Sequence, residues 1–464
     1  MSNFSGLSAA MSGMNAHRRR LDIISENVVN VNTEGYSRQR VDLSAVDRAS
    51  IGLWTGARHN TGGVESTNIE RTRDAILIGS ARLQASQAEN LTTEAEALAR
   101  IETTLGGLEP GGLRDQMDEL WNSFDDLASS PDDPAMRNAV LQKAETLAQG
   151  FSRTTTQIDQ IRTEQEASVA DTVANINSLA EQIASMDRSI LGTLTTNAHP
   201  NSMLDERDRL VGELSSLVNL EVTELETGQV RLAVDGQLLV SNGRANELTL
   251  RRELDPTLAP LGYDRLSVAN PSGRELRITS GRLAAGLRTA HETVPDQRRA
   301  IDALIVDLAD QANTVHSAGV GLDGTTGNDL FDLGPDTGQI SLSADVAGQP
   351  DKVAAAAGGA GLLDESNARD LAQLAEAADG PSSLLVSALS NLAAQVDSAQ
   401  TRAAGARTAS DVALSMATSQ SAVSLDEELI ELMNAQRAFE ASARLVNTID
   451  EMLETLMSMG RVGR

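Results

Sequence analysis

The sequence predicts a mainly α-helical fold in the form of an elongated rod with a small β insert. Aromatic residues make up only 2 % of the 464 residues although 40 % are hydrophobic. Aliphatic side chains must therefore fill the core, which suits helix-on-helix packing. The stretch 135–191 contains one glycine and no proline, as a long helix requires. Residues 221–279 instead alternate apolar and polar side chains between turn signals, which is typical of strands.

The N-terminal segment carries an apolar stripe at helical spacing, which Arg18 interrupts. The stripe consists of Leu7, Met11, Met14, Leu21, Ile24, Val28 and Val31. Asn30, Asn32 and Gly35 follow it, and Asn and Gly tolerate the left-handed conformation that ends a helix. Together with Tyr36 they form a predicted helix-exit motif, where the chain leaves the first helix.

The middle of the chain alternates long helical segments with turns. Residues 41–64 are irregular and rich in glycine, and we expect an extended connector or hairpin there. Helices are predicted over 66–105 and 113–127, and a turn over 129–134 precedes the long helix 135–191. At about 1.5 Å per residue that helix reaches roughly 80 Å. A helix over 201–218 is expected to fold back on it.

The pattern changes at about residue 221. One small β-rich insert is predicted over 221–279, followed by a helix over 281–317 and a mostly irregular stretch over 319–361. Helical spacing then continues to the end of the chain, apart from a break near Gly380 and Pro381.

The C-terminal segment carries a second apolar stripe, with a period of about 3.5 residues. It consists of Leu425, Leu429, Leu432, Phe439, Val446, Ile449, Leu453 and Leu456. Asp426, Glu427 and Glu428 lead this segment, where they complement the helix dipole.

The two terminal stripes suggest a domain organisation. Neither terminal helix can bury its stripe alone, so the simplest arrangement pairs residues 1–45 with 420–464 in a coiled coil. Residues 46–220 and 280–419 then form the central helical bundle, and 221–279 form a β-rich outer domain. We expect the terminal pair to be disordered in an isolated chain and to order when many copies assemble.

Charge and composition exclude several classes of protein. A formal net charge of −28 argues against binding nucleic acid or an anionic membrane surface. The chain has no cysteine, no stretch long enough to span a membrane and no Sec-type signal peptide. It is therefore expected either to stay in the cytoplasm or to leave by a route that cleaves nothing.

The sequence offers little catalytic chemistry. Asp205 and Asp208 lie near His199 and suggest a hydrolase site, but a solvated helix face with i, i+3 pairing explains these carboxylates more simply. Residues 321–332 resemble a calcium loop superficially, yet the ligand positions do not fit and a turn-rich loop is the better interpretation. We therefore predict no catalytic residue, cofactor or metal.

Residues 25–39 read SENVVNVNTEGYSRQ, which resembles the N-terminal signature of bacterial flagellar rod, hook and hook-associated proteins. The Tyr-Ser-Arg-Gln ending is typical of the FlgK family. Glu26 and Glu34 depart from the Asn and Pro usual there; without the proline the turn is less rigid, although Gly35 remains. Further stretches at 129–137, 203–208, 280–287, 316–324 and 424–456 also resemble that family.

The resemblance implies a structural part of the flagellum that joins the hook to the filament. It also implies export through the flagellar type III channel without cleavage, and hence an extracellular location. The implied partners are further copies of the chain, the hook protein, the second hook–filament junction protein and a FlgN-like export chaperone on the C-terminal helix.

Two alternative functions stay open on the sequence alone. The chain could be a hook or distal-rod protein, although those bodies are usually rich in β structure. It could also be a cytoplasmic coiled-coil scaffold, which would never occur in sheared extracellular filaments. An enzyme ranks last, because it would depend on Asp205 or Asp208.

Overall fold

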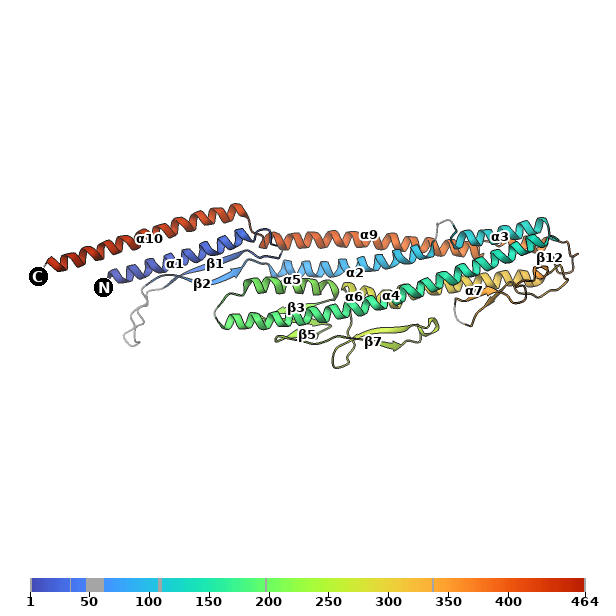
Figure 1. Ribbon diagram of the computed structural model, residues 1–464, viewed down its shortest axis with the longest axis horizontal. Coiled ribbons are helices and arrows are strands. Elements are labelled where there is room, and N and C mark those ends of the chain that lie inside the picture. The colour runs from blue at the N-terminus through green and yellow to red at the C-terminus, as the bar shows by residue number, and fades with distance from the viewer. Residues whose placement is uncertain are drawn as a thin grey trace.

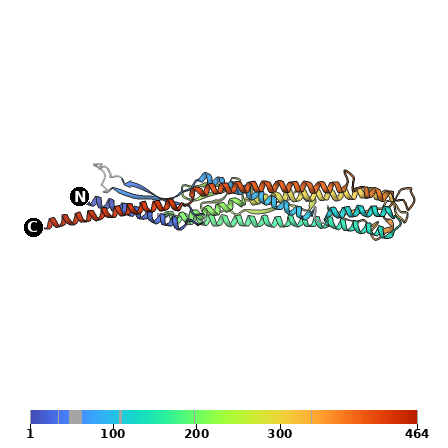
Figure 2. The same ribbon diagram turned by 90° about the horizontal axis from the view of Figure 1, so that it is seen from above.

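The computed structural model describes residues 2–33, 35–46, 62–106, 111–196, 198–335 and 338–462. Within these ranges the chain is an elongated helical rod that continues at one end into a narrower tail carrying both termini (Figure 1; Figure 2). Helices dominate and strands are few, which confirms the predicted mainly α fold. None of the helices in the described ranges combines the length and apolar character needed to cross a bilayer.

The tail consists of two terminal helices and one hairpin. Helix α1 (Ser2–Val29) and helix α10 (Leu425–Val462) run antiparallel, side by side (Figure 1). Strands β1 (Gln39–Val46) and β2 (Gly63–Arg71) form an antiparallel hairpin that packs along α1. The connection over 47–61, including Gly52 and Gly56, lies outside the described residues.

The hairpin corrects one prediction. A helix was expected from about Ser66, but β2 extends to Arg71 and helix α2 (Ala75–Leu105) begins only after Asp74. The Asp74 side chain accepts hydrogen bonds from the amides of Ile76 and Leu77, so it caps the helix there. Residues 63–71 include several β-branched side chains, which favour a strand before that cap.

The rod is built around α4 (Pro134–Thr195), which at about 1.5 Å per residue is about 90 Å long. Its N-terminus is fixed by Asp133, whose side chain accepts the amide of Ala135, and by Pro134 in the first turn. At the end far from the tail, α4 packs with α3 (Leu113–Ser129) and α7 (Val294–Ala318), and α8 (Ser366–Gln373) packs against those two helices. Helix α9 (Pro381–Ser421) returns along α2 to the tail. This end contains the larger core, with Trp121, Phe124 and Phe151 buried.

A second core lies nearer the tail, between α4, α5 (Asn201–Leu217), α6 (Gly281–Arg288) and the strands. The single predicted β insert is in fact two sheets. Strands β3 (Glu221–Glu224), β4 (Val230–Val234), β5 (Gln237–Ser241) and β6 (Arg244–Ala245) form one, in sequence order. Strands β7 (Thr249–Leu254) and β8 (Asp264–Ala269) form a separate antiparallel pair.

The helix predicted over 281–317 is interrupted. A π-helical turn (Thr289–Thr293) separates α6 from α7. Pro295 follows it and has no backbone N–H to continue the helical hydrogen bonds. The carbonyl oxygen of Ala290, within this π-helical turn, accepts a hydrogen bond from the Arg162 side chain instead, with Nε at 3.0 Å.

The stretch 319–361 is mostly irregular, as predicted, but contains two small strand pairs. These are β10 (Phe331–Leu333) with β11 (Ile340–Leu342), and β9 (Gly319–Val320) with β12 (Ala356–Ala357). Buried His316 ties them to α7. Its Nδ1 is 2.7 Å from the Asn328 carbonyl oxygen, and its Nε2 accepts the Ala354 amide at 3.0 Å.

Candidate functional site

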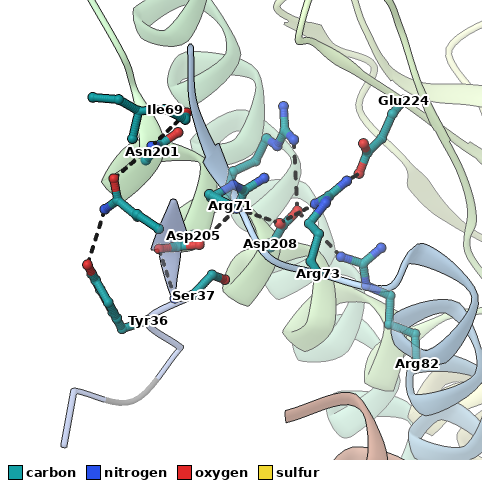
Figure 3. Close-up of polar contacts among 12 residues, drawn as sticks. Tyr36, Ser37, Ile69, Arg71, Arg73, Arg82, Asn201, Asp205, Asp208 and Glu224 are labelled. Atoms are coloured by element: carbon teal, nitrogen blue, oxygen red, sulfur yellow. Dashed lines mark hydrogen bonds and ion pairs between the residues drawn. The ribbon is translucent and has the colours of Figure 1, made fainter. Parts of the chain in front are cut away.

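The tail meets the rod at a polar joint, which we take as the candidate functional site. In the described part of the chain the backbone crosses from tail to rod twice, through residues 72–74 between β2 and α2 and through 422–424 between α9 and α10. The turn after α1 and the start of β1 lie at the same place. Residues of the exit turn, β2 and α5 converge there (Figure 3), and Asn27 of α1 contacts Glu428 of α10. The joint therefore sets how the tail is held.

The seam between the terminal helices is narrow and built on small residues. A methyl group added to Gly13 would lie 3.6 Å from Ser442 Oγ, and one added to Gly6 would lie 3.6 Å from Ile449 Cδ1. On the facing side of α10, Ala435 and Ile449 are the buried apolar side chains among those described. The absence of bulk lets the two helices approach closely.

The predicted stripe residues divide between this seam and the surface. Ile24 and Ile449 are buried. The half-buried members are Leu7, Met14, Leu21, Val28, Val31, Leu432, Phe439, Val446 and Leu453. Met11, Leu425 and Leu429 are exposed, because the seam passes through Ala10 and Ala16 of α1 and through Glu428 and Ala435 of α10. The Leu456 side chain lies outside the described residues.

Asn27, on the last turns of α1, fixes the path of the chain after the helix. It is 1 % exposed, and its Nδ2 donates to the carbonyl oxygen of Gln39 at 2.9 Å. Its Oδ1 accepts the Gln39 amide at 3.0 Å and the Tyr36 hydroxyl at 2.9 Å. The same Nδ2 also lies 3.1 Å from Glu428 Oε2 on α10. One amide side chain thus binds the first strand, the exit turn and the last helix together.

The exit turn uses two of the predicted Asn and Gly residues, Asn30 and Gly35. The Asn30 backbone and side-chain amides both donate to the Glu26 carbonyl oxygen at 3.0 Å, which closes the end of α1. Gly35 has φ +79°, a conformation that side chains disfavour. Asn32 is exposed, and Glu34 lies outside the described residues. Tyr36 is half-buried against Asn27, so it holds the turn to the helix.

Arg38 ties the N-terminal and C-terminal parts of the tail together. Its Nε is 2.7 Å from Glu428 Oε1, and its Nη1 is 2.9 Å from Glu427 Oε2. The Glu428 carboxylate is nearly fully buried, whereas Arg38 is partly exposed. The Arg38 backbone amide also donates to the carbonyl oxygen of Ser421, at the end of α9. This residue therefore contacts both sides of the break between α9 and α10.

Gln39 and Ser37 attach the tail to α5 of the rod. Asn201 Nδ2 donates to Gln39 Oε1 at 2.8 Å and lies 3.3 Å from the Ile69 carbonyl oxygen. The Ser37 amide donates to Asp205 Oδ2 at 3.2 Å (Figure 3). Both strands of the hairpin are thus bonded to the first two turns of α5.

An arginine–carboxylate cluster completes the joint (Figure 3). Arg71 Nη1 is 2.8 Å from Asp205 Oδ1 and 3.0 Å from Asp208 Oδ2. Arg73 Nη1 is 2.7 Å from the same Asp208 oxygen, and Arg82 Nη2 is 3.6 Å from Asp208 Oδ1. Two carboxylates of α5 are therefore shared by arginines from β2, from the 72–74 link and from α2.

This cluster corrects the prediction of a solvated helix face. The side chains of Asp205 and Asp208 are 9 % and 18 % exposed, and they pair with arginines of other elements. Pairing along the helix surface occurs instead at Arg209, which contacts Glu206 and Glu213. The two aspartates hold segments together that are far apart in sequence.

Burial also fixes the protonation of Tyr36. Desolvation raises the pKa of its hydroxyl to about 12, and the nearby charge of Glu26 adds to this. The hydroxyl, which is protonated at neutral pH as in any tyrosine, therefore stays protonated to higher pH than usual and donates to Asn27 Oδ1.

The joint is arranged for holding segments together. The carboxylates of Asp205, Asp208 and Glu428 each face a guanidinium group, and His199 is exposed. In the described ranges, no group of three or more His, Asp or Glu side chains is placed to hold a metal ion. The arrangement supports a mechanical role at this position.

Sequence reasoning missed several residues of the joint. Asn27, Arg38 and Gln39 lie inside the stretch 25–39 that carries the resemblance, so that motif was a usable signal. Glu428 was interpreted only as a favourable charge at a helix start. Nothing in the sequence pairs it with Arg38, 390 positions away.

Comparisons with known proteins match most of the chain. The family model of the flagellar hook-associated protein FlgK helical domain matches residues 98–331. The model of the flagellar basal body rod FlgEFG protein C-terminal region matches 415–459, and that of the flagella basal body rod protein matches 7–36. The last two matches fall on the terminal helices.

Individual relatives agree with the family models. Flagellar hook-associated protein 1 of Bacillus subtilis is 27 % identical over 505 residues, covering all of both chains. The protein of the same name from Salmonella typhimurium is 30 % identical over 330 residues, which is 70 % of this chain and 59 % of that relative. The solved flagellar hook junction protein FlgK from Burkholderia pseudomallei aligns with a TM-score of 0.49 at 25 % identity, covering 55 % of this chain and 46 % of that one.

Proposed function

This chain belongs to the FlgK family of flagellar hook-associated proteins and is a structural protein of the bacterial flagellum at the hook–filament junction; we propose that its tail is the part that assembles. In this proposal the paired terminal helices of many copies form the inner layer of a tubular lattice. The rod forms lateral contacts, and the β strands face outward. The polar joint fixes the tail to the rod.

One observation carries this proposal. After α1 and α10 have paired, seven large apolar side chains among the described ones of α10 are still between 46 % and 70 % exposed. They are Leu425, Leu429, Ile430, Met433, Leu445, Met452 and Met457. Fully burying one such side chain is worth about 1.5–3 kcal/mol, so covering several of them favours association strongly. Exposed apolar surface of this kind is typical of an interface.

We extend the proposal to the organisation of the chain. Residues 1–45 and 420–464 act as the assembly domain, 46–220 and 280–419 as the rod, and 221–279 as the outer part. The assembly domain is expected to be disordered when a copy is alone. The chain contributes structure and no catalysis, because its buried carboxylates at the joint are already paired with arginines.

The proposed partners are inferred from membership of the family and from the exposed apolar side chains of α10. They are further copies of the chain, the hook protein, the second hook–filament junction protein and a FlgN-like export chaperone on the C-terminal helix. The chain is proposed to be exported without cleavage and to function outside the cell. A chaperone that covers the exposed apolar side chains of α10 before export would also keep copies of the chain from associating too early.

The proposal is tested by placing a negative charge at exposed apolar positions of α10 that lie outside the seam between the terminal helices. Met452→Asp and Leu445→Asp should reduce incorporation into sheared flagella at least about tenfold, because each would bury a carboxylate in the lattice. Leu363→Asp, on an exposed loop of the rod, is the matched control and should incorporate normally. Leu432→Asp and Leu453→Asp should also abolish incorporation, with the rod still folded. Normal incorporation of Met452→Asp and Leu445→Asp would contradict the proposal.

A further inference from the structure

A groove of about 560 Å³ opens beside the joint, between the exit turn, α2, α5 and α9. Its lining combines small side chains, a few larger apolar ones, and the charged side chains of Arg82, Asp205, Asp208 and Arg209. The small residues are Ala81, Ala85, Gly212 and Ala417, and the larger ones include Ile78 and Leu414. Small residues allow another helix to approach the backbone closely. Leu414 is 56 % exposed, so the groove carries apolar surface that the chain itself does not cover.

A cation lies in this groove without a close acceptor. In the part of the chain that the structure describes, the ion-pair partner of Arg82 is Asp208, and the distance of 3.6 Å exceeds that of a hydrogen bond. The same carboxylate is already contacted more closely by Arg71 and Arg73. Arg82 is only 15 % exposed, and burial lowers its pKa. An additional carboxylate entering the groove would therefore give Arg82 a partner that it does not have to share with Arg71 and Arg73.

The complementary feature lies on the first turns of α10. Leu425, Leu429 and Met433 follow one another at four-residue spacing and are about half exposed, and Asp426 adjoins them on the same side of the helix. The row starts two residues after Val423, which lines the groove. Helix α10 then runs away from the rod (Figure 1), so the chain cannot place this row in its own groove.

We propose that the groove of one copy binds the first two turns of α10 from a second copy. In this contact Leu425, Leu429 and Met433 cover the small-residue surface, and Asp426 pairs with Arg82. The inference rests on the proposed self-assembly and specifies where one subunit contacts the next. Because groove and row are different surfaces of one chain, the contact is head-to-tail and propagates into a ring or a helix of subunits.

Disulfide trapping tests the contact directly, since the natural chain has no cysteine. Cells would co-express two differently tagged single-cysteine variants, Ala85→Cys and Leu429→Cys, and their sheared flagella would be oxidised. A disulfide needs Cβ atoms about 3.5–4.5 Å apart, so the mixed dimer should exceed the background at least about tenfold. The matched control replaces Ala85→Cys by Leu363→Cys, an exposed site on the rod.

A second set of variants tests the charge pair. Asp426→Asn and Arg82→Gln should each lower the yield of the mixed dimer, and the double variant should be no worse than either single one. Additive losses would show that the two side chains act at separate places.

The outcomes separate this inference from the proposed function. If Leu429→Cys is incorporated but cross-links no better to Ala85→Cys than to Leu363→Cys, the groove contact is wrong and assembly through the tail stands. Cross-linking of Leu429→Cys to its own copies alone would also overturn the groove contact, because the interface would then be symmetric. Failure of the Met452 and Leu445 test would instead overturn the assembly proposal.

Discussion

Replacing Arg38 by alanine should release α10 from the rest of the tail. The Glu428 side chain is only 2 % exposed and contacts Arg38 Nε at 2.7 Å and Asn27 Nδ2 at 3.1 Å. Without the guanidinium of Arg38, the buried Glu428 carboxylate keeps the hydrogen bond from Asn27 Nδ2 but loses its nearby positive charge. Removing one partner of a buried ion pair typically costs 3–5 kcal/mol. Because Arg38 itself is 28 % exposed, we expect about 3 kcal/mol, at the lower end of that range.

Hydrogen exchange in assembled flagella, where the tail is expected to be ordered, measures this effect, since the amides of α10 report local opening of the tail separately from unfolding of the rod. A loss of about 3 kcal/mol corresponds to exchange about 100-fold faster in α10. The Glu428→Gln variant keeps the shape and removes the charge, so it should cost about 1 kcal/mol. In the double variant the loss should be clearly smaller than the sum of the two.

The control is Arg369→Ala, which removes an exposed i, i+4 pair with Glu365 on the rod. Such a surface pair is worth at most about 1 kcal/mol, and α10 should exchange as in the parent chain. If Arg38→Ala changes α10 exchange no more than Arg369→Ala does, the joint does not hold the tail in the way described.

The remaining predictions concern acid stability, backbone strain and the isolated chain. Burial lowers the pKa of His291 to about 4, so between pH 4 and 6.5 the unfolded chain binds more protons than the folded one, and the free energy of unfolding should fall by about 2 kcal/mol from pH 7 to pH 5. Urea unfolding of His291→Gln at the two pH values should show a smaller fall than the parent chain does. An equal fall in the two proteins would contradict this. Gly281 has φ +82°, and a Cβ added there would lie 2.5 Å from a backbone carbon of α5. Gly262 has a similar φ of +72° but open space around it, so Gly281→Ala should lower the Tm much more than Gly262→Ala does. Equal shifts of the Tm would refute the packing argument. Limited proteolysis of the isolated chain should remove roughly forty residues from each end first and leave the rod, whereas tails that resist protease and hydrogen exchange would contradict their expected disorder.

Much of the fold follows from local patterns. The long helix α4 was predictable because the 57 residues of 135–191 contain no proline and one glycine to break a helix, and because Asp133-Pro134 marks its start. The strand β2 was missed because its apolar residues Val64 and Ile69 lie five positions apart and give no alternating pattern to set against the helical spacing that follows. The division of the insert into two sheets depends on packing against α4, which no local pattern records.

The joint was only half predictable, for a physical reason. Asn30 and Gly35 act within one turn of chain, so their residue types suffice to assign them. Arg71, Asp205 and Glu428 act through partners brought together by the whole fold, and a charged residue at a helix start is far more often solvated than buried. Their roles become visible only when the three segments are seen side by side.

The shared carboxylates of α5 have a mechanical consequence. Asp208 lies within 3.8 Å of arginine nitrogens from four residues, so a small rotation of the tail lengthens one contact while another shortens. Each covalent link between tail and rod is only three residues long, which limits the excursion to about 10 Å. We therefore expect the joint to allow a small rotation of the tail, with its range limited by the two short links. Because Asp208 can exchange one arginine for another during such a rotation, we expect the joint to keep an ion pair while the tail bends.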